Sequence, residues 1–348
     1  MAADTKHIFS KSGPSYLSSA GVNWDDEHHK RSVLASLVKG VYVRDHDRRK
    51  NRQGHQALAP PWWKSFHFSL VDDLIDKHDD SYFGAVYEHE HHRSSESIGS
   101  PSPRPRPPRY VIAFRGTVKK SVNLKQDIKL NLLSAMNLLQ KTSRFKKGFE
   151  SALELVHRNG KDDVWLAGHS LGSGLALLVG RKMVTDYEAH LETYLFNPPF
   201  YSLSTGLLAT HMPKLGHAIK VVKSFLKAGL AAAVDGDGDP IIALSTWIPN
   251  LFINTSDPIC SPFIRYFEHR EYMESRGLGG IERVATVSSI RTMMLFAAGV
   301  EGCEALRLVP SAYLTVNVAR SNDFKEAHGI TQWWRPDVQF NCKLHRYE

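Results

Sequence analysis

Cysteine is scarce in this chain of 348 residues, and its scarcity limits the chemistry open to the protein. The three cysteines, Cys260, Cys303 and Cys342, lie far apart along the chain. Such spacing matches neither a disulfide framework nor a set of metal ligands. It is typical of proteins from a reducing compartment. We therefore expect no disulfide, no metal and no other cofactor.

Long apolar runs are also missing. A membrane-spanning helix needs about 18 or more consecutive apolar residues, and no such stretch occurs. The nearest is 285–300, which is short and interrupted by Arg291. The first residues lack the apolar core of a signal peptide. These absences predict a cytoplasmic protein.

Charge is plentiful but not concentrated. Lys and Arg number 44 and Asp and Glu number 36, which gives a net charge of +8. A basic balance can favour nucleic acids, anionic membranes or acidic ligands. Here the basic residues are scattered, and no nucleic-acid recognition motif is present. We therefore expect no nucleic-acid partner.

Composition divides the chain into a tail and one large domain. Residues 1–23 are predicted to form a flexible N-terminal tail, and residues 24–348 a single domain. Within it, segment 88–109 is dominated by proline, serine, histidine and arginine, which cannot build a core, so we predict a disordered loop there. Residues 202–240 are predicted to form a helical insertion.

Short apolar segments alternate with helical segments through the domain. Asn23 is placed to cap a helix over 25–43, and the charged stretch 44–56 is expected to be a loop. The alternation favours an α/β fold with a mostly parallel central sheet flanked by helices. The predicted strands cover residues 81–88, 110–114, 164–167, 193–196, 251–254 and 313–318.

The most specific motif is the GHSLG sequence of residues 168–172, which matches the G-x-S-x-G nucleophile elbow. It follows the apolar segment 164–167 and precedes an apolar helix. The tight turn lifts the serine hydroxyl above the sheet, and larger residues at the two glycine positions would clash. The helix N-terminus also points N–H groups at developing negative charge. We predict that Ser170 is a nucleophile, with a plain glycine-rich turn as the alternative.

A serine nucleophile needs a base and an orienting acid, which follow such an elbow in the order acid, then histidine. Asp257 comes after the predicted strand 251–254 and is favoured as the acid, with an ordinary turn residue before proline as the alternative. The poorer choices for the acid are Asp186, which lies on the helix after the elbow, and Asp235, Asp237 and Asp239, which lie in a glycine-rich loop. His328 comes after the predicted strand 313–318 and is favoured as the base over His345, which lies near the C-terminus.

A further strand end points to the oxyanion site. The predicted strand 110–114 runs straight into Arg115, Gly116 and Thr117. A glycine at a strand end lets the backbone approach a substrate closely. This turn is expected to supply a second N–H donor, with a simple tight turn as the alternative.

Several sequence segments around these residues can be compared with known families. They are VIAFRGT (111–117) with the downstream Asn123 and Asp127, KKGFESAL (146–153), VWLAGHSLGSGLA (164–176) and SDPI (256–259). With them the chain resembles the class 3 lipases, over roughly residues 60–335. HGITQWW (328–334) adds similarity to a plant group of class 3 lipase-like proteins often labelled GDSL esterase/lipase, although no Gly-Asp-Ser-Leu motif occurs here. Lys147 stands where these lipases usually have a histidine.

The resemblance implies an α/β-hydrolase fold and the hydrolysis of carboxylic esters through an acyl-enzyme. It implies a triad of Ser170, Asp257 and His328, and an oxyanion hole formed by the backbone N–H groups of Thr117 and Leu171. The implied substrate is a lipid or small-molecule ester.

Two other functions stay open. A lipase-like signalling scaffold would be weak or inert, and such proteins commonly lack a triad member, whereas all three candidates are present here. A peripheral membrane module is suggested by Lys220, Lys223 and Lys227, which punctuate an apolar helical run as in a helix on an anionic membrane. A helix packed on the core is the simpler interpretation of that run. Segments 119–145 and 203–234 are the two candidate covers of an acyl site.

Overall fold

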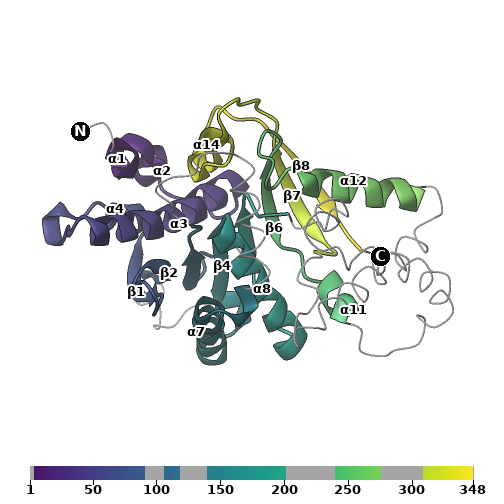
Figure 1. Cartoon of the computed structure of the whole chain (residues 1–348), viewed down its shortest axis with the longest axis horizontal. Coiled ribbons are helices and arrows are strands. Elements are labelled where there is room, and N and C mark those ends of the chain that lie inside the picture. Colours follow the sequence, from purple (N-terminus) through teal and green to yellow (C-terminus); the bar gives the residue numbers. More distant parts are fainter. Residues whose placement is uncertain (1–3, 91–105, 118–138, 201–239, 276–308, 348) are drawn as a thin grey trace, which may run out of the picture.

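The computed structural model describes residues 4–90, 106–117, 139–200, 240–275 and 309–347. These residues form an eight-stranded sheet in which the strands lie side by side in chain order (Figure 1). The strands are β1 (Phe68–Ile75), β2 (Tyr82–His89), β3 (Tyr110–Phe114), β4 (Val164–His169), β5 (Thr193–Phe196), β6 (Asn250–Asn254), β7 (Ala312–Asn317) and β8 (Phe340–His345). Strands β3 to β7 are parallel, whereas β1, β2 and β8 pair antiparallel at the two edges.

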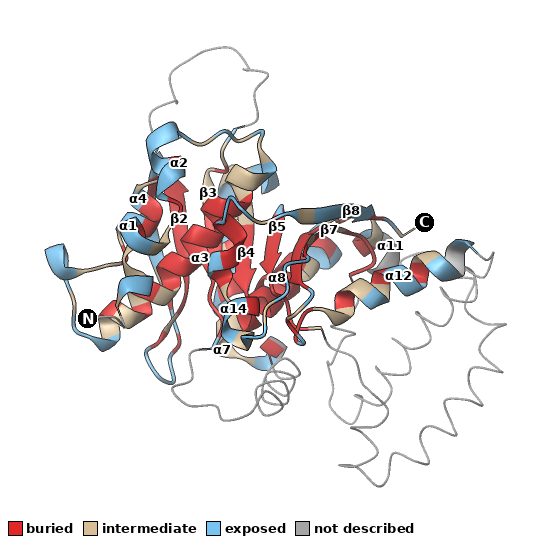
Figure 2. Ribbon diagram, turned by 90° about the horizontal axis from the view of Figure 1, so that it is seen from above, coloured by how far each residue is buried: buried red, intermediate tan, exposed pale blue. Residues whose placement is uncertain are grey.

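Helices lie on both faces of this sheet. The helices are α1 (Phe9–Ser12), α2 (Ser15–Ala20), α3 (Glu27–Arg49), α4 (Pro61–Lys64), α7 (Ser143–Asn159), α8 (Leu171–Tyr187), α11 (Pro240–Ser245), α12 (Pro262–Ser275) and α14 (Phe324–Ala327), with short 3₁₀ turns η1 (Thr5–His7), η2 (Gly54–Gln56), η3 (Leu139–Lys141), η4 (Lys161–Asp163) and η6 (Ile330–Trp334). Figure 2 shows the buried strands between α3 and α8. Val111 and Ala113 of β3 enter the core under α3, whereas Ile112 and Phe114 enter the core under α7 and α8. Both faces are therefore buried, as the apolar strands predict.

The predicted strands occur, with ends that differ by at most two residues from those expected. The edge strands β1 and β8 were not predicted. In β8 four consecutive residues are exposed, and β1 carries the polar pair Asp72 and Asp73. Edge strands of this kind lack the apolar alternation by which a strand is recognised.

Helix α3 begins later than predicted. The capping residue is Asp26 and not Asn23, because the Asp26 carboxylate accepts the backbone N–H groups of His28 and His29 at 2.7 and 3.2 Å. Its negative charge also suits the N-terminal end of the helix dipole.

Helix α3 also ends later than predicted, since it continues to Arg49 through residues expected to be a loop. Asp45 is buried there and makes ion pairs with Arg48 and Arg49 at 3.1 and 3.0 Å. Pairs three and four residues apart lie on one side of a helix, so this run of charges supports the helix instead of ending it.

The expected flexible tail over residues 1–23 is corrected by the structure from residue 4 onward. This segment contains the short helices α1 and α2, whose side chains Phe9 and Leu17 are buried in the core under α3. Helices of four and six residues are too short for the periodicity that reveals a helix in a sequence.

Side chains far away in the chain hold this N-terminal segment. Trp334 donates its indole N–H to the Ser12 carbonyl at 2.9 Å, and the Tyr16 hydroxyl donates to the Trp334 carbonyl at 2.9 Å. Arg31 of α3 donates to the Trp333 carbonyl at 2.9 Å. The N-terminal helices are thus tied to the segment that follows the predicted base.

Several of the predicted segments lie wholly or partly outside the residues that the structure describes. Of the predicted loop 88–109, His89 belongs to β2 and donates its backbone N–H to Arg109, and residues 91–105 lie outside. The predicted insertion lies outside up to residue 239. Lys220, Lys223 and Lys227 also lie outside the described residues. So do the candidate cover 203–234 and most of the other candidate cover, 119–145. Within the described ranges, no helix is long and apolar enough to cross a membrane.

Candidate active site

The turn at Ser170 has the geometry of a nucleophile elbow. Strand β4 ends at His169 and helix α8 begins at Leu171, with Ser170 between them at φ 56° and ψ −126°. This backbone conformation is strained for a residue with a side chain. A Cβ on Gly168 would lie 2.3 Å from the Gly172 carbonyl oxygen, so only glycine fits there. The two glycines of the motif therefore permit the close strand–helix approach that their spacing predicts.

The turn after β3 lies directly against the nucleophile. A Cβ on Gly116 would be 2.8 Å from the Ser170 Cβ, and Thr117 is the next residue. Leu171 is the first residue of α8, where a backbone N–H has no acceptor within the helix. The structure thus places the two predicted oxyanion residues on the two segments that meet at Ser170.

Ser170, His328 and Asp257 form a hydrogen-bonded row. The His328 Nε2 atom lies 2.9 Å from Ser170 Oγ, and His328 Nδ1 lies 2.8 Å from Asp257 Oδ2. Asp257 follows β6, and His328 ends α14 beyond β7. The His328 side chain is 15% exposed and that of Asp257 is fully buried, so the imidazole edge faces the site and the carboxylate is shielded.

The Asp257 carboxylate is held by several donors. Its Oδ2 accepts hydrogen bonds from Asn197 Nδ2 at 2.8 Å and from the Cys260 thiol at 3.1 Å, and its Oδ1 accepts the Ile259 N–H at 3.0 Å. Burial by itself would raise the pKa of Asp257, but the hydrogen bond and charge of His328 and the other donors outweigh it and lower that pKa. Burial and the nearby carboxylate raise the pKa of Cys260, which therefore remains a thiol donor.

The competing candidates are engaged elsewhere. His345 lies in β8 and pairs with Glu271, its Nδ1 being 2.9 Å from the carboxylate. Asp186 pairs with Lys182 on the exposed end of α8. Asp235, Asp237 and Asp239, alternatives for the acid, lie outside the described residues.

Asn197 is a residue of the site that the sequence did not single out. It follows β5 with a left-handed φ of 46° and is fully buried. Its amide nitrogen donates to Asp257 and also to the Ala327 carbonyl at 3.1 Å, while its oxygen accepts the Trp333 indole N–H at 2.7 Å. One amide thus joins the acid loop to the loop of the base. The Asn-Pro pair after a buried strand was the available signal.

The loop of the base is held through three consecutive carbonyl groups. The Gln332 amide donates to the carbonyls of Ala327 and Gly329 at 2.8 Å each, and the His169 ring nitrogen Nε2 lies 2.8 Å from the His328 carbonyl. Side chains from the elbow and from η6 therefore fix the backbone on both sides of the imidazole.

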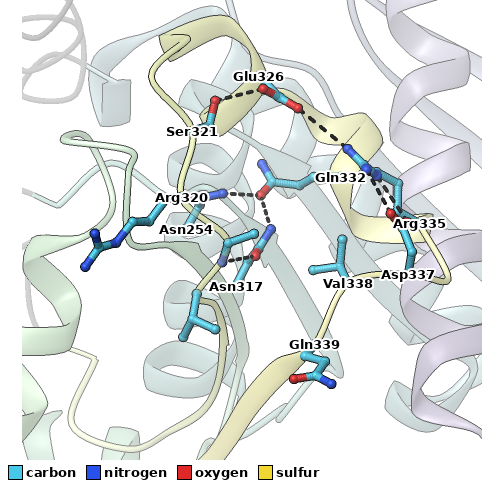
Figure 3. A pocket seen from close by; sticks show the side chains of 12 residues that line it. Asn254, Asn317, Arg320, Ser321, Glu326, Gln332, Arg335, Asp337, Val338 and Gln339 are labelled. Atoms are coloured by element: carbon cyan, nitrogen blue, oxygen red, sulfur yellow. Dashed lines mark hydrogen bonds and ion pairs between the residues drawn. The ribbon is translucent and has the colours of Figure 1, made fainter.

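Gln332 also separates this loop from a pocket of about 440 Å³ (Figure 3). Its oxygen accepts the amide N–H groups of Asn254 and Asn317 at 2.7 and 2.9 Å, at the ends of β6 and β7. At the rim, Glu326 and Arg335 form an ion pair at 3.6 Å. The triad side chains do not line this pocket, and Gln332 connects its wall to the backbone on either side of His328.

Arg115 secures the turn after β3. Its guanidinium donates to the carbonyls of Tyr82 at 2.6 Å and Gly116 at 2.7 Å, and to the Asp45 carboxylate at 3.2 Å. The arginine of the FRGT segment therefore orients the peptide that carries the Thr117 N–H, and does not face the substrate as a charge.

Two further sequence expectations concern metal ligands and Lys147. Among the described residues, no group of three His, Cys, Asp or Glu side chains could hold a metal ion. Lys147, at the position where the resemblance leads one to expect histidine, lies on the surface with its ammonium 3.5 Å from the Asp72 carboxylate. A surface pair of this kind contributes little to stability and leaves the triad untouched.

Comparison with known proteins places this site in a family. The family model described as Lipase (class 3) matches residues 111–205, which contain the turn after β3 and the elbow. A GDSL esterase/lipase of Arabidopsis thaliana is 41% identical over 363 aligned positions that span all of both chains. No solved structure matches the chain. Class 3 lipases share the α/β-hydrolase fold, with which the sheet is consistent. The chain contains a segment similar to class 3 lipases, and it belongs to the same plant lipase-like family of carboxylic ester hydrolases as this Arabidopsis protein.

Proposed function

We propose that the protein hydrolyses carboxylic esters of lipids through a triad of Ser170, His328 and Asp257 and an acyl-enzyme intermediate. The observation that carries this proposal is the continuous hydrogen-bonded row from the Ser170 hydroxyl to the buried Asp257 carboxylate, at 2.9 and 2.8 Å. Family membership supports the substrate class, since both matches are named for lipid or ester hydrolysis.

The proposed first step forms the acyl-enzyme. His328 Nε2 takes the proton of Ser170 Oγ as that oxygen attacks the ester carbonyl carbon. The tetrahedral intermediate then breaks its bond to the alcohol oxygen, and the imidazolium returns the proton to this leaving group. In the second step His328 takes a proton from a water molecule as the water oxygen attacks the acyl carbonyl carbon. The bond from that carbon to Ser170 Oγ then breaks, the imidazolium returns the proton to Oγ, and the acid is released. The balance is one ester and one water converted to one acid and one alcohol.

Asp257 stabilises the charged form of the base. Its donors lower its pKa despite burial, so the carboxylate is negative when the His328 imidazole accepts a proton. The bond to His328 Nδ1 also leaves Nε2 directed at Ser170. The buried acid therefore sets both the tautomer and the orientation of the imidazole.

The developing oxyanion would be bound by backbone N–H groups of Thr117 and Leu171. Support comes from the position of Leu171 at the start of α8, where the helix dipole is positive, and from the contact of the Gly116 turn with Ser170. Donors of this kind stabilise charge that exists only in the transition state.

Ser170→Ala tests the nucleophile. We expect kcat on p-nitrophenyl butyrate to fall by several orders of magnitude, on the order of 10⁶ in a comparable triad. The variant should also lose labelling by a fluorophosphonate probe. Ser173→Ala is the matched control, because Ser173 is a fully buried serine of the same helix whose hydroxyl donates to the Phe196 carbonyl. Near-wild-type activity of Ser170→Ala would contradict the proposal.

The base is tested in the same assay. His328→Ala should abolish activity and His345→Ala should retain it, because only His328 contacts Ser170. A panel of p-nitrophenyl esters and glycerolipids of increasing acyl length would then define the substrate. An inert scaffold predicts neither labelling nor turnover by the wild-type protein.

A further inference from the structure

A series of hydrogen bonds runs from the turn after β3 (residues 115–117, the proposed oxyanion turn) to the backbone of His328 without passing through the triad side chains. The Gly116 N–H donates to the Tyr42 hydroxyl oxygen at 2.7 Å, and that hydroxyl lies 2.8 Å from His169 Nδ1. His169 Nε2 in turn lies 2.8 Å from the His328 carbonyl oxygen. Tyr42 is part of α3, a helix outside the sheet, so this chain connects three separate parts of the fold.

The direction of each bond follows from the donors present. A backbone N–H can only donate, so the Tyr42 hydroxyl accepts from Gly116 and gives its single proton to His169 Nδ1. The proton of the neutral imidazole is then on Nε2, from which it is donated to the His328 carbonyl. Every donor and acceptor in the chain is matched in this one arrangement.

His169 suits this role because it stays neutral. Burial, followed by the charge of His328, lowers the pKa of His169 to about 3. Burial raises the pKa of Tyr42 to about 12, so its hydroxyl keeps its proton. The arrangement therefore persists over the pH range between these two pKa values, and it places no second cation beside His328.

The same hydrogen bonds also determine the orientation of the Gly116–Thr117 peptide. The Gly116 N–H is engaged with Tyr42, and the Gly116 carbonyl is engaged with Arg115 at 2.7 Å. The peptide that carries the Thr117 N–H is thus held on both sides. The Tyr42–His169 link joins this turn to the loop of His328, which follows β7 in the chain but lies beside Ser170 at the end of β4.

We propose that Tyr42 and His169 are a pair of positioning residues that align the oxyanion turn with the catalytic base. This inference rests on the proposed function. Neither side chain contacts the reacting atoms, so the pair acts through the backbone of Gly116 and through the backbone of His328. We expect the Tyr42–His169 pair to affect binding of the transition state more than binding of the substrate. The reason is that the alignment of the oxyanion turn with His328 matters most when negative charge develops on the substrate.

Tyr42→Phe tests the proposal, with Tyr87→Phe as its matched control. Tyr87 is fully buried, and its hydroxyl donates to the carbonyl of Leu37 in α3 at 3.2 Å. Each variant therefore removes one tyrosine hydroxyl that forms a hydrogen bond: Tyr42 is a residue of α3, and Tyr87 is bonded to that helix. For Tyr42→Phe we expect kcat on p-nitrophenyl butyrate to fall roughly 10- to 100-fold with KM nearly unchanged. Tyr87→Phe should stay within about twofold of wild type in kcat, since its bond is remote from the site.

A second readout separates alignment from stability. An alkyl trifluoromethyl ketone adds the Ser170 oxygen to its carbonyl carbon and presents an oxyanion. Its affinity should weaken in Tyr42→Phe by the same factor as kcat/KM. His169→Gln, which offers both an acceptor and a donor, should recover most of the activity lost in His169→Phe. Thermal midpoints verify that each variant is folded at the assay temperature.

The outcomes are distinct. If wild-type protein shows neither turnover nor fluorophosphonate labelling of Ser170, the proposed function fails and this inference fails with it. If wild type is active but Tyr42→Phe retains as much kcat as Tyr87→Phe, only the inference is overturned. It is also overturned if the inhibitor affinity of Tyr42→Phe equals that of wild type, or if His169→Gln is no more active than His169→Phe.

Discussion

The buried, neutral His169 predicts how the stability of this protein should respond to acid. The pKa of this residue is about 3 in the folded protein and about 6.5 when unfolded. Below pH 6.5 the unfolded chain binds a proton that the folded chain does not. The free energy of unfolding therefore falls as the pH decreases from 6.5 towards 3, and the loss stops only below the folded pKa.

The size of the loss follows from the same two values. At pH 4.5, two units below the unfolded pKa, the penalty is roughly 3 kcal/mol, because each unit of separation is worth about 1.4 kcal/mol. At pH 7.5 it is close to zero. A loss of this size is a large fraction of the stability of a typical domain.

Urea unfolding of wild type and His169→Gln at pH 7.5 and 4.5 isolates this contribution. Glutamine does not titrate, so the stability difference between the two proteins should change by roughly 3 kcal/mol in favour of the variant at pH 4.5. His7, whose pKa is also lowered to about 3, is present in both proteins and cancels. His190→Gln, at a histidine bonded to Thr246 on the surface, is the control. Equal pH dependence in wild type and His169→Gln would refute the reasoning.

Three further changes have defined outcomes. Gly116→Ala should lower kcat at least tenfold, because its Cβ would lie 2.8 Å from that of Ser170; an unchanged kcat in the nitrophenyl ester assay would argue against close contact at this turn. Asn197→Ala should reduce stability by about 1–3 kcal/mol in urea unfolding, since buried partners are left unpaired, and should lower kcat; normal values of both would show that Asp257 is held without it. Replacement of residues 91–105 by a short glycine–serine linker should leave the thermal midpoint and kcat nearly unchanged, because closure entropy varies weakly with loop length. A collapse of either would mean that the segment packs on the domain.

The three residues of the proposed triad could be chosen from the sequence because their positions follow from topology. Ser170 lies in a local motif that specifies its own turn, and Asp257 and His328 come after strands that their apolar composition reveals. The carboxyl ends of parallel strands meet at one edge of a sheet, so order along the chain was enough to choose them. The hydrogen bonds among the three side chains are what the structure adds.

The supporting residues were not predictable in this way. Tyr42 and His169 are 127 positions apart, and no local pattern links a tyrosine on a helix face to a histidine in an elbow. Asn197 and Gln332 likewise act on carbonyl groups that belong to other segments. The persistence of α3 to Arg49 depended on ion pairs of the buried Asp45 that sequence periodicity does not register. For Tyr42, His169 and Asn197 the deciding partners are distant in the chain, whereas at the end of α3 they lie three and four residues away.

The contact of the N-terminal helices with Trp334 has a consequence for the order of events during synthesis. The bonds from Ser12 and Tyr16 to Trp334 join residues 322 and 318 positions apart, next to the loop of His328. During synthesis, the elbow with Ser170 therefore leaves the ribosome before His328 has been made. Helices α1 and α2 cannot form their hydrogen bonds to Trp334 until almost the whole chain has been synthesised. Closing so long a loop has an entropic cost that later contacts must offset. Activity is thus expected to appear only when the two ends of the polypeptide have met.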